Sequence, residues 1–245
     1  MTEPDAPRGS MTLLEHLDEL RKRLFKAVLA YLIALGACWV VSERLVGFIV
    51  QPIRDHLFEG SDIVFIHVSE AFMIYMKSAA LTAIFVAAPL IFYQLWAFIA
   101  PALYKNERRW VFPFLLFSTL FFVGGGAFGY YVATPIAASW LLNLGSEFTA
   151  QITLRSAFSF QSTLILGMGA VFEMPILIFF LARIGVVTPA FLMRNFRYAV
   201  LVIALLSAVI TPTGDMMTMA VFAVPMILLY LLGVGVAAIS GRSRR

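Results

Sequence analysis

Long apolar stretches alternate with short polar ones along most of this sequence. Six stretches are candidates for membrane-spanning helices: 24–41, 72–99, 110–132, 158–181, 198–210 and 216–239. A helix needs about 20 residues to cross a hydrocarbon core about 30 Å thick. The fifth stretch would reach only about 20 Å at 1.5 Å per residue, so we expect a thinner bilayer around it. The pattern predicts an all-α polytopic membrane protein with six spans.

An amphipathic pattern precedes the first span. Leu13, Leu17, Leu20 and Leu24 recur at helical spacing, and charged residues occupy the other side. This pattern predicts a helix that lies at the membrane surface before the chain enters the bilayer. We expect three parts: a disordered tail over 1–11, one membrane domain over 12–239, and a basic tail over 240–245.

The composition supports a membrane protein and argues against several other classes. Apolar residues make up 61% of the chain and charged residues 13%, with a mean hydropathy of +0.90, whereas soluble domains are about a quarter charged. One cysteine and three scattered histidines give no disulfide framework or metal-ligand cluster. We find no nucleophile with a base and no phosphate-binding loop. We therefore expect neither an enzyme nor a bound metal or cofactor, and the net charge of +4 forms no nucleic-acid patch.

The distribution of Lys and Arg predicts the orientation. With both termini in the cytoplasm, 14 of the 18 basic residues fall on that side: 13 in segments 1–23 and 240–245 and the loops 100–109 and 182–197, and Lys26 at the start of the first stretch. This distribution follows the positive-inside rule. The long loops 42–71 and 133–157 then lie outside. The first of them contains residues 46–53, which we expect to form a short helix that caps the outer face. We find no internal repeat of the kind that many transporters carry.

Two acidic residues lie in or between the spans. Glu173 is flanked by apolar residues in the fourth stretch, and intramembrane acids usually face a protein interior or a wet cavity. The alternative is a carboxyl group that only packs or hydrogen-bonds to a neighbouring helix. Asp215 ends the TPTGD turn before the sixth stretch, where it is either a functional acid or the N-cap of that helix.

Two other carboxylates, Glu19 and Glu107, are expected on the cytoplasmic side. Glu19 has Arg23 four residues later, and Glu107 lies among Lys105, Arg108 and Arg109, so either could simply balance local charge. If both face one groove, they offer two acceptors to a cationic ligand. Arginine would be preferred, because its planar guanidinium binds a carboxylate in a bidentate manner.

Two other interpretations stay open at this point. A proton-coupled small-solute transporter would use Glu173 with polar groups at similar depth, for which Ser118, Thr119, Ser162 and Thr163 are the main candidates. A membrane scaffold would use none of the acids. Gly124, Gly125 and Gly126, in the third stretch, favour close helix packing over phosphate binding.

Four motifs resemble one known family over nearly the whole chain. They are HLDELRKR (16–23), YQLWAFIAPALYKNERR (93–109), FEMP (172–175) and TPTGD (211–215). The chain resembles the TatC family, the core receptor subunits of the twin-arginine protein translocase. The resemblance implies six helices in a concave, bowl-like arrangement with short fifth and sixth spans, no enzymatic activity, and multi-pass insertion in a bacterial-type inner membrane.

The same resemblance implies a role for individual residues. Glu19 and Glu107 would bind the paired arginines of signal peptides on folded cargo. The other residues implied at this site are Leu20, Arg21, Arg23, Phe98, Pro101 and Arg109. Pro52 would belong to the outer cap, Glu173 would lie on the concave face, and Asp215 would lie between spans five and six.

The implied partners are also specific. Single-helix membrane subunits of the TatA and TatB type would dock on spans five and six, several copies of the chain would assemble with them and with membrane lipid, and the proton-motive force would drive export. Nucleic acid is not an implied partner. The sequence departs from the family where Gly214 replaces a frequent proline and Met219 a frequent glutamine. Glu70 in the first outer loop has no assigned role.

Overall fold

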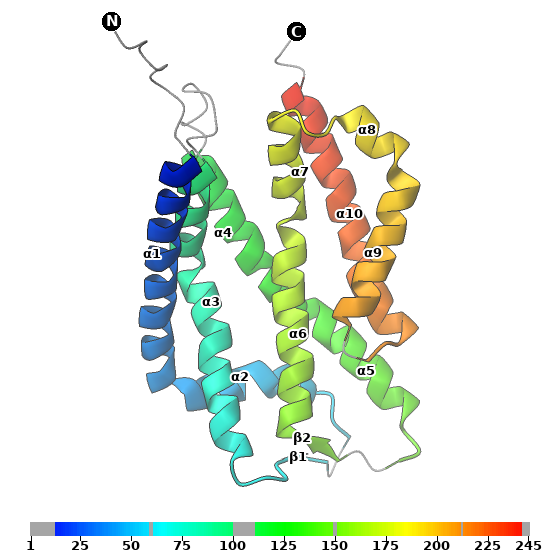
Figure 1. Ribbon diagram of the computed structural model, residues 1–245. Coiled ribbons are helices and arrows are strands. Elements are labelled where there is room, and N and C mark those ends of the chain that lie inside the picture. Colours follow the sequence, from blue (N-terminus) through cyan, green and yellow to red (C-terminus); the bar gives the residue numbers. More distant parts are fainter. Residues whose placement is uncertain (1–12, 59–60, 100–110, 149–150, 212, 242–245) are drawn as a thin grey trace, which may run out of the picture.

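Almost all of the described chain is helical. The computed structural model describes residues 13–58, 61–99, 111–148, 151–211 and 213–241. Its helices are α1 (Leu13–Val40), α2 (Ser42–Arg54), α3 (Glu70–Ile99), α4 (Val111–Phe128), the π-helical segment η3 (Gly129–Ala133), α5 (Thr134–Leu144), α6 (Leu154–Phe172), α7 (Met174–Arg183), α8 (Pro189–Arg194), α9 (Phe196–Ile210) and α10 (Met216–Gly241). The start of α1 and the end of α10 lie at one end of the bundle, which we call the terminal end (Figure 1). We call the other end, which carries α2, the cap end.

The predicted six spans are present. Five helical segments are long and apolar enough to cross a membrane, namely Glu15–Val40, Glu70–Ile99, Phe112–Leu144, Leu154–Arg183 and Met216–Ile239. The sixth candidate, α9, has 15 residues, which reach about 22 Å, so the prediction of a short fifth span is confirmed. The sixth span is not short, because α10 has 26 residues and continues through Pro225.

The amphipathic segment is part of the first span. Residues 13–40 form one continuous helix, and Figure 1 shows it as a single rod along α3. The expectation of a separate surface helix is therefore wrong. No glycine or proline occurs between Leu13 and Leu35, so nothing in the local sequence interrupts the helix between its charged and its apolar part.

The third span is longer than the sequence predicts. Residues 133–144 were expected in an outer loop, but η3 and α5 extend the helix to Leu144. Pro135 is tolerated in the first turn of α5 because η3 changes the hydrogen-bond spacing just before it. The carbonyl of Gly129 accepts from the backbone N–H of Thr134 and from its hydroxyl at 2.8 Å, so this acceptor is satisfied within the segment.

The fourth span contains a break. Helix α6 ends at Phe172 and α7 starts at Met174, with Pro175 in its first turn. Proline has no N–H and favours the start of a helix. Glu173 is the single residue between the two helices, so the intramembrane acid lies at the kink.

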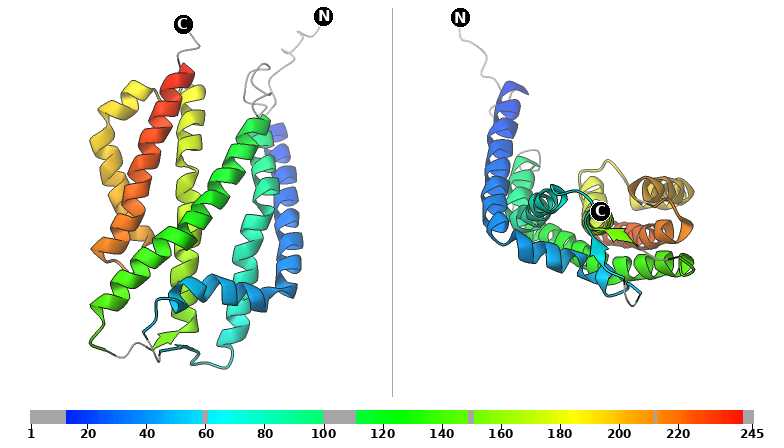
Figure 2. Two further views of the ribbon diagram at one scale, coloured as in Figure 1. Left: turned by 180° about the vertical axis from the view of Figure 1, so that it is seen from behind. Right: turned by 90° about the horizontal axis from the view of Figure 1, so that it is seen from below.

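The cap end is closed by α2, the short helix expected in the first outer loop. It runs across the ends of the other helices (Figure 2) and buries Val46, Ile49, Val50, Pro52 and Ile53. Tyr130 on η3 donates from its hydroxyl to the carbonyl of Phe48 at 2.8 Å, and the two rings stack at 4.6 Å. Helix α2 is thus attached to the third span.

The structure assigns a role to Glu70. Strands β1 (Ile63–Val64) and β2 (Ile152–Thr153) pair in parallel and join the two outer loops. The buried Glu70 carboxylate accepts from the backbone N–H of Arg155 at 2.8 Å, of Ile66 at 3.1 Å and of His67 at 3.4 Å. Glu70 therefore links the first outer loop to the start of α6.

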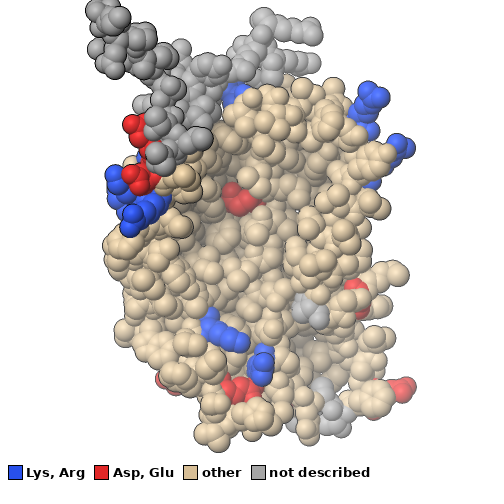
Figure 3. Space-filling model, viewed as in Figure 1, with Lys and Arg blue, Asp and Glu red and all other residues tan. Residues whose placement is uncertain are grey.

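The helices enclose a concave face. In Figure 2, α1 and α3 form one side, α9 and α10 the other, and α4 crosses between them. Figure 3 shows that the face seen in Figure 1 is hollowed and mostly uncharged, with an acidic group inside the hollow. The predicted bowl-like, all-α membrane fold is confirmed.

The glycines of α4 set the distance between helices. A Cβ atom on Gly125 would lie 2.5 Å from the carbonyl oxygen of Met168 on α6, and one on Gly126 would lie 2.5 Å from the ring of Phe85 on α3. A Cβ atom on Gly124 would have no atom within 4 Å. Two of the three glycines thus permit the close packing that the sequence suggested.

We predict that Gly125→Ala destabilises the protein and that Gly124→Ala does not. The first variant forces α4 away from α6, which should lower the free energy of unfolding by about 1–3 kcal/mol. The second adds a better helix former in open space. Thermal unfolding of both variants in mild detergent tests this, and equal midpoints would contradict the close contact at Gly125.

Candidate functional site

Glu19 and Arg23 form an ion pair on α1 near the terminal end. The Arg23 Nε and Nη2 atoms both donate to Oε1 of Glu19, at 2.9 Å and 2.5 Å. The Glu19 side chain is only 19% exposed. Its second oxygen, Oε2, is buried and has no hydrogen-bond partner among the described residues. Leaving a buried acceptor unused costs free energy, so this oxygen favours an additional donor.

The end of α3 lies against the same part of α1. The His16 ring stacks on the Phe98 ring with centroids 4.5 Å apart. Since Glu19 is less than one turn from His16, the structure brings Phe98 and Glu19 to one region between two helices. Leu20 is 42% exposed beside them, and Arg21 is exposed as well. Four of the predicted site residues on α1 and one on α3 therefore gather at the terminal end.

Three predicted site residues lie outside the described part of the chain. They are Pro101, Glu107 and Arg109.

Glu173 belongs to a second polar group, inside the membrane-spanning region. Its Oε1 atom is buried without a hydrogen-bond partner among the described residues. Its carboxyl group interacts with the Ser118 side chain on α4, and the Ser118 hydroxyl accepts from the indole N–H of Trp96 on α3 at 3.1 Å. Three helices thus meet at a buried polar chain. The sequence suggested Ser118 but not Trp96, because only the fold places Trp96 opposite α4.

Asp215 is the N-cap of α10. Its Oδ1 atom accepts from the backbone N–H of Thr218 at 2.8 Å, and its Oδ2 atom accepts from the Thr213 hydroxyl at 2.5 Å. Burial raises the pKa of the Asp215 carboxyl, but these hydrogen bonds outweigh it and hold the pKa below its ordinary value. The capping alternative for Asp215 is confirmed.

The preceding glycine explains one departure from the family pattern. Gly214 has a φ angle of +63°, a left-handed conformation that glycine adopts readily and that proline, fixed near −65°, cannot adopt. The turn between α9 and α10 therefore has a shape that a proline at position 214 would not allow.

No group of three or more His, Cys, Asp or Glu side chains in the described part of the chain could hold a metal ion. The structure assembles two polar groups. One is the Glu19 carboxylate, of which only one oxygen is hydrogen-bonded among the described residues, and the other is the Glu173–Ser118–Trp96 chain. Both suit the binding of an organic ligand or peptide better than hydrolysis or group transfer, since neither contains an activated nucleophile.

The fold and these groups define a polytopic membrane protein with two polar groups suited to ligand binding. The family described as "Sec-independent protein translocase protein (TatC)" matches residues 15–225. The TatC protein of Koribacter versatilis is 45% identical over 93% of this chain and 85% of its own length, and that of Helicobacter pylori strain J99 is 39% identical over 92% and 88%. A crystal structure titled as the twin arginine translocase receptor TatC superimposes with a TM-score of 0.82 and 31% identity, over 92% of this chain and 99% of that one.

The chain belongs to the TatC family. It is a component of a Sec-independent protein translocase, which works with other Tat subunits, and it is not an enzyme. The comparisons give no support to a proton-coupled small-solute transporter.

We predict that Asp215→Ala lowers the free energy of unfolding by about 1 kcal/mol at pH 7, because α10 loses its cap. Asp215→Asn should lose less, since its side-chain oxygen can still accept from Thr218. The folded pKa is lowered, so the charge contributes above the unfolded pKa of about 3.9 and is lost as the pH falls through the folded value.

Thermal unfolding in detergent between pH 3 and pH 7 tests both statements. The difference between the unaltered protein and Asp215→Asn should shrink at the acidic end of this range. A difference that grows on acidification would contradict the sign of the pKa shift.

Proposed function

We propose that this protein is the receptor that binds twin-arginine signal peptides, through the Glu19 carboxylate at the terminal end. The observation that carries the proposal is the buried Oε2 atom of Glu19, which has no hydrogen-bond partner within the described ranges. The solved relatives are titled as twin arginine translocase receptors, which supports the same ligand for this chain.

The geometry at Glu19 suits a guanidinium. Arg23 uses only Oε1, although a carboxylate has two oxygens and about four lone-pair sites. A ligand arginine can therefore donate to Oε2 without displacing Arg23. A lysine would supply a single point charge and would match this fixed acceptor less well. The second arginine of the motif would pair with Glu107.

The neighbouring residues would shape the rest of the site. The His16–Phe98 stack offers an apolar, aromatic wall beside Glu19, and Leu20 offers an exposed aliphatic surface. Arg23 would hold the carboxylate in place. The family resemblance implies that three further residues belong to the site, namely Arg21, Pro101 and Arg109.

The terminal end would face the cytoplasm of a bacterial cell at its inner membrane. The distribution of basic residues supports this orientation: 14 of the 18 belong to the cytoplasmic side under this assignment, 13 in the termini and loops and Lys26 near the start of the first span. Signal peptides on newly made proteins would then meet the site directly.

After binding, the apolar part of the signal peptide would enter the hollow toward Glu173. The hollow is mostly uncharged (Figure 3), and the buried acid at its kink would be the group that responds to the proton-motive force during export of folded cargo. Short helix α9 would thin the bilayer locally and lower the barrier for a large cargo. Pro52, buried in α2, would help to keep the cap end closed.

The single-helix partner subunits would dock on spans five and six. Leu201, Leu205 and Val209 are spaced four residues apart on α9 and are 68%, 65% and 75% exposed, so they form one apolar stripe along that helix. Asp215 would fix the turn between α9 and α10 beside this stripe. Several copies of the chain would assemble with these subunits and with membrane lipid.

We predict that the purified protein in nanodiscs binds an Arg-Arg signal peptide and that the Lys-Lys version binds much more weakly. Glu19→Gln and Glu107→Gln should each cost roughly 2–5 kcal/mol, since each leaves a ligand guanidinium without its charged partner. Asp18→Asn is the matched control: it removes an exposed carboxylate from the adjacent position of α1.

Fluorescence anisotropy of a labelled peptide measures all five cases. If the two peptides bind alike, or if Glu19→Gln behaves like Asp18→Asn, the receptor site is not at Glu19. The two carboxylates would then serve only to balance local charge, as in a scaffold.

A further inference from the structure

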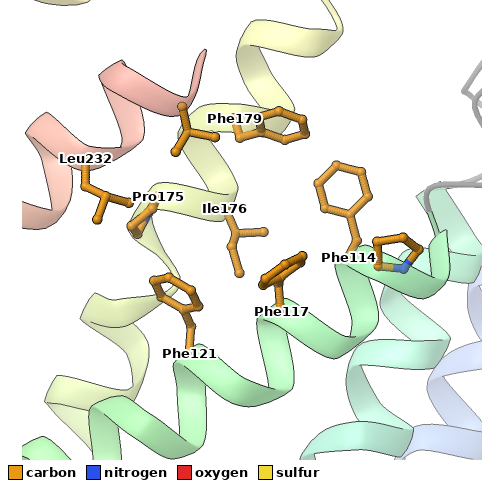
Figure 4. A pocket seen from close by; sticks show the side chains of 9 residues that line it. Phe114, Phe117, Phe121, Pro175, Ile176, Phe179 and Leu232 are labelled. Atoms are coloured by element: carbon orange, nitrogen blue, oxygen red, sulfur yellow. The ribbon is translucent and has the colours of Figure 1, made fainter. Parts of the chain in front are cut away.

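An apolar cavity of about 300 Å³ lies between α4, α7 and α10. Its walls include Phe114 and Phe117 from α4, Phe179 from α7, and Leu232 and Val236 from α10 (Figure 4). Phe114 is in the first turns of α4, Phe179 is one turn from the end of α7, and Val236 is near the end of α10. The cavity therefore lies in the half of the membrane-spanning region nearer the terminal end.

The cavity follows from how the three helices diverge. Glycines bring α4 close to α6: a Cβ atom on Gly125 would meet Met168 and one on Gly129 would meet Leu164, both at backbone oxygens. Toward the terminal end α4 runs obliquely away from α7 (Figures 1 and 2). Pro113 on α4 and Pro175 on α7 line the space between the two helices.

The lining selects a flexible apolar occupant. All nine lining side chains are apolar, and the cavity is open, since Phe117 is 51% and Leu232 46% exposed. An extended peptide would leave its backbone N–H and C=O groups without partners there. A hydrocarbon chain fits and needs no polar partner.

A cation marks where the polar end of the occupant would lie. Arg183 is four residues after Phe179 on α7, so it lies on the same helical face, one turn nearer the terminal end. An acyl chain that enters the cavity from that leaflet places its headgroup at this level. A positively charged side chain there favours a headgroup with a net negative charge.

We infer that this cavity binds one acyl chain of an anionic phospholipid, with the headgroup at Arg183. The site is separate from the signal-peptide site at Glu19 and does not depend on it. Trp96 is a built-in reporter, because its buried ring stacks on the cavity wall at Phe114 with centroids 4.6 Å apart.

The test measures quenching of Trp96 fluorescence by brominated acyl chains. Trp39, Trp110 and Trp140 are replaced by Phe, and the full-length chain is placed in phosphatidylcholine nanodiscs. A minor fraction of the lipid is brominated phosphatidylglycerol in one sample and brominated phosphatidylcholine in the other. We expect several-fold stronger quenching by phosphatidylglycerol at equal mole fraction.

Three variants locate the effect. Leu232→Phe combined with Val236→Phe fills the cavity and should abolish most of the quenching by either lipid. Arg183→Gln should make the two lipids equal. Ile33→Phe, on the exposed face of α1, should change nothing, since Ile33 is 67% exposed and away from the cavity. Unchanged unfolding midpoints and Arg-Arg peptide binding show that the filled variant is folded.

Two results would overturn the inference. In the first result, both lipids quench Trp96 equally and the filled variant does not reduce the quenching. Trp96 would then report only ordinary contact with the surrounding lipid. The second result comes from a photo-cross-linker placed at position 117 in native membranes. If it forms an adduct with a single-helix subunit and none with lipid, a partner helix covers this opening.

Discussion

The structure depends on one constraint: a chain that crosses hydrocarbon must satisfy its own backbone polar groups. Each interruption of a span meets this requirement locally. At η3 the carbonyl of Gly129 accepts hydrogen bonds from the backbone N–H and the hydroxyl of Thr134. At the α6–α7 break, the carbonyl of Glu173 accepts from the backbone N–H groups of Ile176 and Leu177. The interruptions are therefore tolerated within the spans. The oblique course of α4 (Figure 2) separates it from α7 toward the terminal end, where the apolar cavity lies.

The need to satisfy buried polar groups also distinguishes acids with a structural role from acids that are candidates for function. Glu70 and Asp215 use their carboxylate oxygens on backbone N–H groups and a hydroxyl at the ends of helices, so their charges are explained by the fold. Glu19 and Glu173 each keep a buried oxygen without a partner among the described residues. An acid that the fold does not satisfy is the better candidate for a ligand or a proton, and these two lie where a signal peptide would bind and where it would move.

Hydrophobic pattern predicted the six spans, the short α9 and the helix α2, because each depends on local composition. It failed where a boundary depends on context. The charged start of α1 continues the span because nothing interrupts it, and Pro135 does not end the third span because η3 accommodates it. Motif similarity identified Glu19, but not the stack of Phe98 on His16 or the contact of Trp96 with Ser118. Such contacts join distant segments, and no local pattern encodes them.

The central claim is that paired arginines bind at the terminal end, between α1 and α3. Disulfide cross-linking locates them directly, in a background where the buried Cys38 is replaced by Ala. Leu20→Cys and Val64→Cys are matched, since these side chains are 42% and 41% exposed at opposite ends of the bundle. A signal peptide with a cysteine beside its arginines should cross-link at position 20 and not at position 64. Cross-linking at position 64, or equally at both, would contradict the account.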